Sequence, residues 1–265
     1  MGDAQAESDD YRDSLPSETV IDRRYVVQGM LGRGGMGYVY RVQDTGRDRV
    51  VALKQLTSLQ PGLPGARAFP GLLGRRSAVD ARKQAERLSL FRREYQTLAD
   101  LAHPNIISAY EYGLHEGQPY YTMELLRGDD IGRLAPMAWT RACAVLRDVA
   151  SALTLLHARR LLHRDLSPTN VHLTRDGTTK LIDFGAMGAM GPTSRVMGTP
   201  PFMAPEVLQL EELDARADLY ALGALGFYLL TGRTVFPARS IAELCSFAGR
   251  RPEPPSSHVP QLPGT

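Results

Sequence analysis

Residues 163–185, with the sequence HRDLSPTNVHLTRDGTTKLIDFG, carry two acids and one amide on loops that follow a predicted helix and a predicted strand: Asp165, Asn170 and Asp183. Phosphoryl transfer demands little covalent chemistry from a protein. It requires metal ligands, a charge clamp and a carboxylate that orients the attacking hydroxyl group. Carboxylate and amide oxygens are hard ligands of the kind that Mg²⁺ binds. The residues of this segment are of the types that phosphoryl transfer requires.

A glycine-rich stretch lies upstream of this segment, at Gly32–Gly37, and has the spacing GxGxxG. Missing side chains let backbone N–H groups approach phosphate oxygens closely. The stretch lies between two predicted strands, whereas the dinucleotide-binding fingerprint needs a strand before it and a helix after it, so a Rossmann fold is disfavoured. Taken alone, the stretch fits a flexible hairpin turn equally well.

The run Val51–Lys54 places a lysine on a predicted strand, at a reach suited to phosphates beneath the glycine-rich turn. A single lysine on a strand is usually only solvated. A charge that holds two phosphates must itself be held, and Glu94 on the next predicted helix is the expected partner, with Glu86 as the competing candidate.

Periodicity predicts two groups of elements along the chain. Three antiparallel strands between Tyr25 and Gln55 and two later strands at Ile106–Gly113 and Pro119–Leu125 form the first group. Residues 57–77 contain three prolines and several glycines, which predicts a loop. A helix is predicted from Asp80 to about Leu101. Its apolar residues recur at steps of three and four and predict one buried stripe: Leu88, Phe91, Tyr95, Leu98 and Leu101.

The second group is mainly helical, with helices predicted at Trp139–Arg159 and Ala215–Leu230. Two short strands are expected at Val171–Leu173 and Lys180–Ile182, and the boundary between the two groups is expected near Leu126–Gly128.

The overall charge is nearly balanced, with 31 basic and 29 acidic side chains among 265 residues. This balance argues against nucleic acid or lipid as the main partner. Two segments are locally polarised. Residues 1–22 carry seven acids and one arginine, and we expect residues 1–20 to be a disordered tail. Residues 57–85 form a basic insert before the long helix, and a solvated surface is a simpler reading of this insert than a docking site.

The two cysteines, Cys143 and Cys245, show no metal-ligand spacing and are expected to be buried, reduced thiols. The N-terminus lacks a signal pattern, and the longest apolar stretch, Ala221–Leu230, is about half of what a membrane span needs. We therefore expect no membrane segment in this chain and a cytoplasmic location.

With Ala204–Glu206 and Asp218 in the motif ADLYALG, the chain resembles the catalytic domains of eukaryotic-type serine/threonine protein kinases over roughly residues 25–250. The segments PYYTMELL and MGTPPFMAPE resemble the corresponding segments of bacterial members of this family. The resemblance implies an α+β, bilobal protein-kinase fold. The N-lobe, 21–126, would hold a small antiparallel β-sheet and one long helix. The mainly helical C-lobe, 127–265, would stop before the last helices of the family.

The resemblance also implies that ATP and Mg²⁺ bind and that the phosphate acceptors are serine and threonine hydroxyls of proteins. It assigns Asp165 as the catalytic carboxylate, Lys54 as a ligand of the α- and β-phosphates, and Glu94 as the residue that fixes Lys54. Asn170 and Asp183 would bind the metal. The ATP-binding residues would be Leu31, Gly32, Arg33, Gly34, Gly35, Met36, Gly37, Val39, Ala52, Lys54, Met123, Glu124, Leu126 and Asp130.

Three hydroxyl residues in the expected activation loop, Thr193, Ser194 and Thr199, are candidates for phosphorylation. In the family, a phosphate on this loop often pairs with the arginine that precedes the catalytic carboxylate, here Arg164. Thr199 is also expected to position the substrate hydroxyl near Asp165.

Three departures from the family pattern leave an alternative open. Ser167 replaces a lysine that contacts the γ-phosphate, His172 replaces an aliphatic residue beneath adenine, and the arginine that would pair with Glu206 is missing. The alternative is a pseudokinase or a nucleotide-binding regulatory module with little phosphotransfer; a small-molecule kinase is a more distant one. The sequence leaves the protein substrate and the oligomeric state undetermined.

Overall fold

The computed structural model describes residues 14–34, 36–57, 70–247, 249–260 and 262, and within this range it leaves out the side chains of 70–80. The predictions for residues 1–13, Gly35 and 58–69 lie outside the described residues. The chain divides into two compact units. The first contains the chain up to Asp100 together with Ser108–Leu125, and the second contains Leu101–Ile107 and the chain from Leu126 onward.

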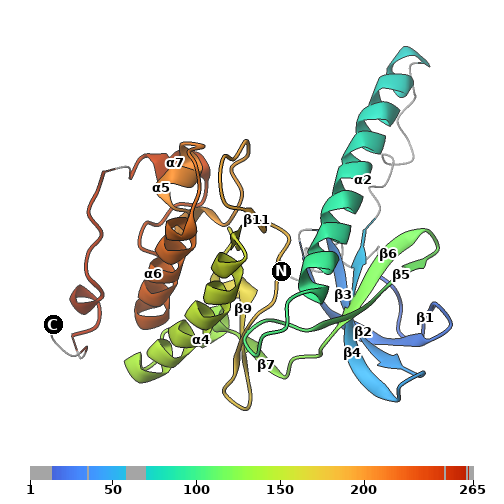
Figure 1. The fold of residues 1–265 in the computed structure, drawn as a ribbon, viewed down its shortest axis with the longest axis horizontal. Helices are drawn as coiled ribbons and strands as arrows, with labels where there is room; N and C mark the ends of the chain where they lie inside the picture. The colour runs from blue at the N-terminus through green and yellow to red at the C-terminus, as the bar shows by residue number, and fades with distance from the viewer. Residues whose placement is uncertain (1–13, 35, 58–69, 248, 261, 263–265) are drawn as a thin grey trace, which may run out of the picture. The chain divides into compact units, whose positions relative to one another are not determined.

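The first unit is built on a six-stranded antiparallel sheet with the strand order β1-β2-β3-β4-β6-β5 (Figure 1). The strands are β1 (Val20–Ile21), β2 (Tyr25–Arg33), β3 (Gly37–Asp44), β4 (Arg49–Leu56), β5 (Ala109–His115) and β6 (Gln118–Met123). The five predicted strands are confirmed, and β1 is an addition. The turn between β3 and β4 is stabilised by the carboxylate of Asp44, which accepts hydrogen bonds from the backbone N–H groups of Gly46 and Arg47.

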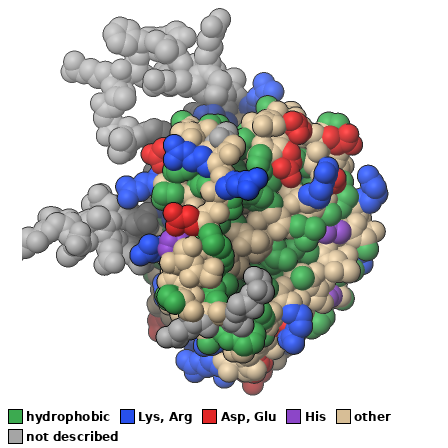
Figure 2. All heavy atoms as spheres, turned by 90° about the vertical axis from the view of Figure 1, so that its left-hand side faces the viewer, with side chains coloured by type: hydrophobic (Ala, Val, Ile, Leu, Met, Phe, Trp, Pro, Cys, Tyr) green, Lys and Arg blue, Asp and Glu red, His purple; other side chains and the backbone are tan. Residues whose placement is uncertain are grey.

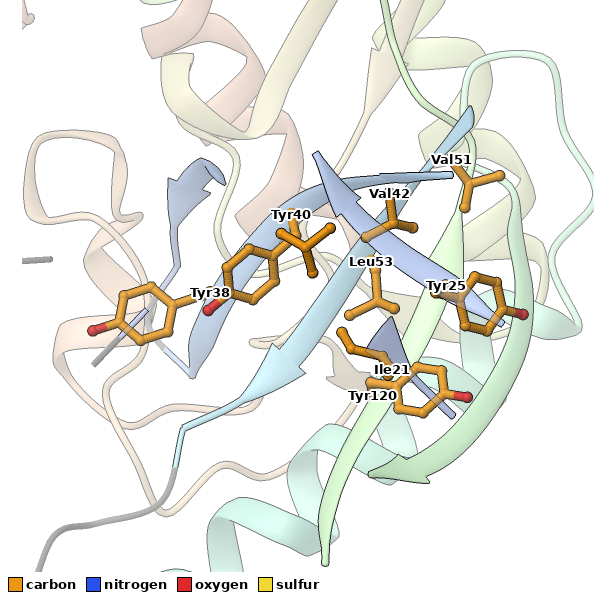
Figure 3. Packing of buried hydrophobic residues seen from close by; sticks show 9 residues of the cluster. Ile21, Tyr25, Tyr38, Tyr40, Val42, Val51, Leu53 and Tyr120 are labelled. Atoms are coloured by element: carbon orange, nitrogen blue, oxygen red, sulfur yellow. The ribbon is translucent and has the colours of Figure 1, made fainter. Parts of the chain in front are cut away.

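One side of this sheet carries a hydrophobic cluster of aromatic and β-branched side chains (Figure 3). Its buried members are Ile21, Tyr25, Val27, Tyr38, Tyr40, Val42, Val51, Leu53 and Tyr120. The rings of Tyr25 and Tyr120 pack edge to face with their centroids 5.8 Å apart. Leu15 donates its backbone N–H to the Tyr40 hydroxyl at 3.0 Å, and Glu18 donates to the Val27 carbonyl. Leu15 and Glu18, which the sequence assigns to a disordered tail, therefore contact the sheet.

Helix α2 (Pro70–Ala99) begins ten residues before the predicted start at Asp80, so the prediction of a loop through residue 77 is wrong from Pro70 onward. Proline is well tolerated at the first helical position, because the N–H group that it lacks has no acceptor within the helix there. The predicted stripe is confirmed: Phe91 and Leu98 are fully buried, and Leu88 and Tyr95 are half-buried.

The second unit consists of helices and short antiparallel strands. Its helices are α3 (Ile131–Leu134), α4 (Trp139–Ala158), α5 (Pro205–Leu208), α6 (Ala215–Thr231) and α7 (Ile241–Cys245), with short 3-10 turns at Pro168–Asn170, Pro200–Phe202 and Pro255–Ser257. Its strands are β7 (Gly128–Asp130), β8 (Leu161–Leu162), β9 (Val171–Thr174), β10 (Thr179–Leu181) and β11 (Gly188–Ala189). The strands form one sheet of order β10-β9-β7 and a β11-β8 pair. Helices α4 and α6 pack side by side.

Helix α6 has clear end signals. Asp214 caps its N-terminus by accepting a hydrogen bond from the Arg216 N–H at 2.8 Å, and Gly232 ends it with a left-handed backbone at φ 68°. The predicted helices at Trp139–Arg159 and Ala215–Leu230 are both confirmed within a residue or two of their ends.

Residues Leu101–Ile107 belong to the second unit, although the sequence assigns them to the first lobe. The Asn105 side-chain amide donates to the Thr179 carbonyl at 2.9 Å, and Ile107 donates its N–H to the Leu181 carbonyl at 2.9 Å. These bonds attach the segment to β10. For this reason the strand expected from Ile106 begins only at Ala109.

The prediction that both cysteines are buried is wrong, because Cys143 and Cys245 are exposed free thiols. Cys143 lies next to the buried Ala142 on α4, and one step of 100° around the helix turns it outward. Among the described helices, none combines the length and the apolar character that a membrane span requires.

Candidate active site

The first unit holds the predicted lysine in a buried ion pair. Lys54 on β4 lies 2.7 Å from Glu94 Oε1 on α2, and both side chains are almost fully buried. Glu94 Oε1 also accepts a hydrogen bond from the Tyr121 hydroxyl at 3.0 Å. Tyr121 faces Lys54 directly across the β4–β6 pairing. A buried charge is tolerated only when a partner and hydrogen bonds compensate it, and this arrangement fixes the ammonium group in one position.

The glycine-rich stretch forms the hairpin between β2 and β3. Gly34 and Gly37 exchange backbone hydrogen bonds of 2.8 and 3.3 Å. Gly37 packs against β4 so closely that an added Cβ would lie 1.9 Å from the Gln55 carbonyl oxygen, so glycine is required there. At Gly34 an added Cβ would lie 4.0 Å from Lys54 Cε. The hairpin is therefore adjacent to the lysine stem.

The predicted adenine-binding residues of the first unit are only partly grouped. Ala52 and Met123 are paired across β4 and β6, and both are buried. Val39 is half-buried, while Leu31 is half exposed. Glu124 donates its backbone N–H to the Ser108 carbonyl at 2.9 Å, so this N–H is already used within the unit.

The loop at 163–170 in the second unit is fixed by a buried carboxylate on α6. Asp218 Oδ2 accepts the backbone N–H of His163, and Oδ1 accepts that of Arg164, both at 2.9 Å. His157 Nε2 lies 2.9 Å from the same carboxylate. Arg164 adopts a left-handed backbone at φ 65°, a conformation that costs energy for a residue other than glycine. The anchored turn presents Asp165, the next residue.

Asp165 lies at the centre of a small hydrogen-bond network. Its Oδ2 accepts a bond from Asn170 Nδ2 at 2.9 Å, and Asn170 Nδ2 also donates to the Asp165 backbone carbonyl. Its Oδ1 accepts a 2.7 Å bond from the Thr199 hydroxyl. The carboxylate is thereby oriented by two neighbours while the residue stays partly exposed.

The donor set fits a hard cation. Because Asn170 donates both bonds through its nitrogen, its amide oxygen points away from Asp165 as an acceptor. The Ile182 N–H binds the Asn170 carbonyl, which places Asp183, the next residue, beside Asn170. Within the described residues, no three His, Cys, Asp or Glu side chains cluster as a metal site. A Mg²⁺ ion here would depend on the two residues, water and phosphate oxygens.

Ser167, which replaces the family's lysine, is fully buried. Its hydroxyl lies 3.0 Å from the Thr169 hydroxyl. The side chain therefore supplies no charge, and its hydroxyl bonds within its own loop.

Burial lowers the pKa of two histidines of the second unit. His163 is completely buried, its ring lies 5.1 Å from the Phe184 ring, and burial lowers its pKa despite the nearby carboxylates of Asp218, Asp165 and Asp183. Burial also lowers the pKa of the half-buried His172, against the opposing effect of Asp129 and Asp130. A neutral imidazole at His172 is compatible with an apolar surface beneath a base.

We expect the second unit to lose stability as pH falls below the ordinary histidine pKa of 6.5. Below that value the unfolded chain binds a proton at His163 that the folded chain does not bind, so the unfolded state is favoured, by up to about 1.4 kcal/mol per pH unit. In urea unfolding between about pH 7 and about pH 5, the variant His163→Phe should show a shallower loss. Equal slopes for the two proteins would contradict this assignment.

The predicted activation loop shows one accessible hydroxyl. Ser194 is exposed, whereas the Thr193 hydroxyl is half-buried and donates to the Arg195 carbonyl at 3.1 Å. The guanidinium of Arg164, the expected partner of a loop phosphate, already donates a hydrogen bond to the Ala189 carbonyl at 2.5 Å.

Asp130, predicted to lie near the ribose, serves as the N-cap of α3. Its Oδ1 accepts the Arg133 N–H at 3.1 Å, and its Oδ2 lies 3.3 Å from Arg133 Nε. Leu126 begins the second unit four residues earlier.

A cavity of about 590 Å³ in the second unit contains none of the predicted site residues. It is lined by Phe227, Arg233, Thr234, Val235, Phe236, Pro237, Phe247, Arg250, Arg251, Pro252, Glu253 and His258.

Figure 2 shows one face of the molecule, on which basic and acidic side chains are interspersed with hydrophobic ones. Charges of both signs are therefore mixed on this face.

Three residues of the site escaped the sequence reading. Tyr121 could have been found from the strand pairing, because it faces Lys54. His157 and Arg87 carry no such signal, since each reaches its partner only through the folded chain: the Asp218 carboxylate for His157, and the backbone of the glycine-rich hairpin for Arg87.

Comparisons of the sequence with protein-family models and with known proteins agree with one another. A family model described as protein kinase domain matches residues 76–251. The serine/threonine-protein kinase PknJ of Mycobacterium tuberculosis is 34% identical over 252 residues, or 91% of this chain and 39% of that protein. PknL of the same organism is 33% identical over 238 residues, or 86% of this chain and 54% of that protein. PksC of Streptomyces coelicolor is 35% identical over 260 residues, or 91% and 43%. The chain thus spans about half the length of these relatives, or less.

Solved structures agree with the sequence comparison. The kinase domain of PknI from Mycobacterium tuberculosis aligns with a TM-score of 0.65 and 30% identity, covering 94% of this chain and 87% of that one. A double mutant of the same domain aligns with a TM-score of 0.67 and 28% identity, covering 94% and 86%.

Proposed function

Because the chain belongs to the protein kinase family, and to its bacterial eukaryotic-type serine/threonine class, we propose that it transfers the γ-phosphate of ATP to serine and threonine hydroxyls of proteins. The observation that carries the proposal is the network around Asp165. A carboxylate fixed by Asn170 and Thr199 is placed to accept a hydrogen bond from an incoming hydroxyl and to orient it.

In this proposal Lys54 binds the α- and β-phosphates, and Glu94 holds Lys54. The backbone of Gly32–Gly37 covers the phosphates, and the apolar residues Ala52 and Met123 contact adenine. A bound Mg²⁺ ion would neutralise phosphate charge, and Asn170 and Asp183 would hold it. The remaining ATP-binding assignments from the sequence stand as part of the same proposal.

Thr199 is proposed as a positioning residue rather than a phosphorylation site. A phosphate on its hydroxyl would place a dianion against the Asp165 carboxylate that it now donates to, and like charges at that distance repel. Ser194 is the favoured site of modification, because its side chain is exposed. Thr193 is the second candidate.

The buried Ser167 is the observation that favours a second function, a nucleotide-binding module with negligible transfer. One charge that the family brings to the γ-phosphate is absent at this position. The lysine, the two acids, the amide and the glutamate that the family uses are all present in the sequence, so we favour the enzyme.

The deciding experiment incubates the purified chain with Mg²⁺, ATP and a generic basic protein, and locates phosphate by mass spectrometry. Phosphate on serine or threonine, absent in Asp165→Asn, is the expected result. A folded chain that binds ATP and transfers no phosphate would contradict the proposal and support the binding module.

The proposal includes a cytoplasmic location, where ATP is available. The free thiols of Cys143 and Cys245 suit a reducing compartment. The partners would be proteins that present serine or threonine side chains.

A further inference from the structure

A side chain of α2 contacts the backbone of the glycine-rich hairpin. Arg87 donates a hydrogen bond from Nη2 to the Met36 carbonyl oxygen at 2.9 Å. The same oxygen accepts the backbone N–H of Thr57, the residue after β4, at 3.1 Å. One carbonyl in the hairpin is therefore held from two directions, by the residue that follows β4 and by the helix.

Arg87 and Glu94 are seven residues apart, which is about two helical turns, so they lie on the same face of α2. Glu94 holds Lys54, and Arg87 holds the hairpin. One rigid helix face thus fixes both elements to which phosphate binding is assigned in the first unit. A shift of α2 along its axis or a rotation about it would disturb both contacts together.

The two arms of the hairpin differ in how they are held. The second arm is fixed at Met36 by Arg87 and Thr57, and at Gly37 by its contact with the β4 backbone. The first arm is held by β3: Gly32 and Arg33 pair with Val39 and Tyr38, and Gly34 exchanges backbone hydrogen bonds with Gly37.

We propose that Arg87 is a positioning residue that clamps the glycine-rich hairpin to α2 in the conformation that binds the phosphates of ATP. The proposal rests on the proposed function for its effect on catalysis, but the clamp itself is a property of the first unit. Arginine suits this role, because its guanidinium stays charged and makes a charge-assisted hydrogen bond to the carbonyl.

Removing the clamp raises the population of open hairpins, and the apparent affinity for ATP falls by the fraction that remains closed. For Arg87→Met, we expect the KM for ATP to rise about tenfold, the effect of losing one hydrogen bond to a charged donor. The value of kcat should change little, because the hairpin is closed again once ATP is saturating. Arg93→Met, a change at an exposed arginine of the same helix, is the matched control.

Arg87→Lys separates the hydrogen bond from packing. An ammonium group can donate to the Met36 carbonyl, so lysine should recover most of the ATP affinity while methionine, which has a similar stem, should not. If Arg87→Met bound ATP as tightly as Arg87→Lys, Arg87 would act through packing, and the proposal would be overturned.

Hydrogen exchange followed by mass spectrometry provides a readout that does not depend on activity. In Arg87→Met, peptides containing Gly34, Gly37 and Thr57 should exchange faster than in the wild type and in Arg93→Met, while peptides of α6 should not change. If the wild type transfers no phosphate, the proposed function fails, and the exchange rates still decide whether the clamp exists. If the wild type is active and Arg87→Met matches Arg93→Met in both measurements, the clamp proposal fails.

Discussion

Asp165→Asn should lower kcat by about 10²–10⁴-fold, the usual contribution of a positioned acid or base, with little change in the affinity for ATP. The change removes the negative charge that orients the attacking hydroxyl and keeps the shape of the side chain. Single-turnover transfer measured beside nucleotide binding separates the two effects. A variant with wild-type kcat would remove Asp165 from the mechanism.

The local network should survive this substitution. The new amide can turn its oxygen toward the Asn170 nitrogen and its nitrogen toward the Thr199 hydroxyl, which can accept a hydrogen bond as well as donate one. The unfolding midpoint should therefore stay close to that of the wild type. Thr199→Val is the companion variant: it leaves the carboxylate charged and removes only one of its two orienting bonds, so its loss in kcat should be the smaller one.

Lys54→Met should both destabilise the first unit and abolish efficient transfer. Among the described residues, Glu94 would remain buried with the Tyr121 hydroxyl as its one side-chain donor, and leaving one charge of a buried pair unpaired costs about 3–5 kcal/mol. Loss of the phosphate contact should lower kcat/KM by roughly 10²-fold or more. Chemical denaturation measures the first effect and transfer kinetics the second.

The double variant Lys54→Met with Glu94→Gln tells stability apart from chemistry. The introduced amide would be neutral and could still accept the hydrogen bond from Tyr121, so most of the lost stability should return. Activity should not return, because no charge then faces the phosphates. If the double variant regained activity, Lys54 would act only through the stability of the fold.

The residues proposed to carry the chemistry are identified from their types and spacing, which follow from what phosphoryl transfer needs, and their roles stay predictions. The pairing of Lys54 with Glu94 appears in the structure as predicted. The hydrogen bond between Asn170 and Asp165 is an addition, since the sequence assigns Asn170 to the metal with Asp183. The five main strands and the two long helices were also predictable, since their apolar residues recur with regular periods.

The sequence failed where tertiary contacts decide the outcome. Proline and glycine in 70–77 indicated a loop, yet α2 begins at Pro70, because proline is acceptable in the first helical turn. The segment Leu101–Ile107 looked like part of the first lobe, but bonds to β10 place it in the second unit. The apolar neighbours of Cys143 predict a buried thiol, but its place on α4 turns it outward.

The arrangement around Asp218 has a consequence for how the domain fails on heating. The backbone N–H groups of His163 and Arg164 donate hydrogen bonds to the Asp218 carboxylate, which is buried in the first turn of α6. This long helix packs against α4. Their exchange with solvent should require the opening of α6 itself and not a local fluctuation of the loop. Thermal inactivation should then coincide with cooperative melting of the second unit, and no folded but misaligned catalytic loop should accumulate below that temperature.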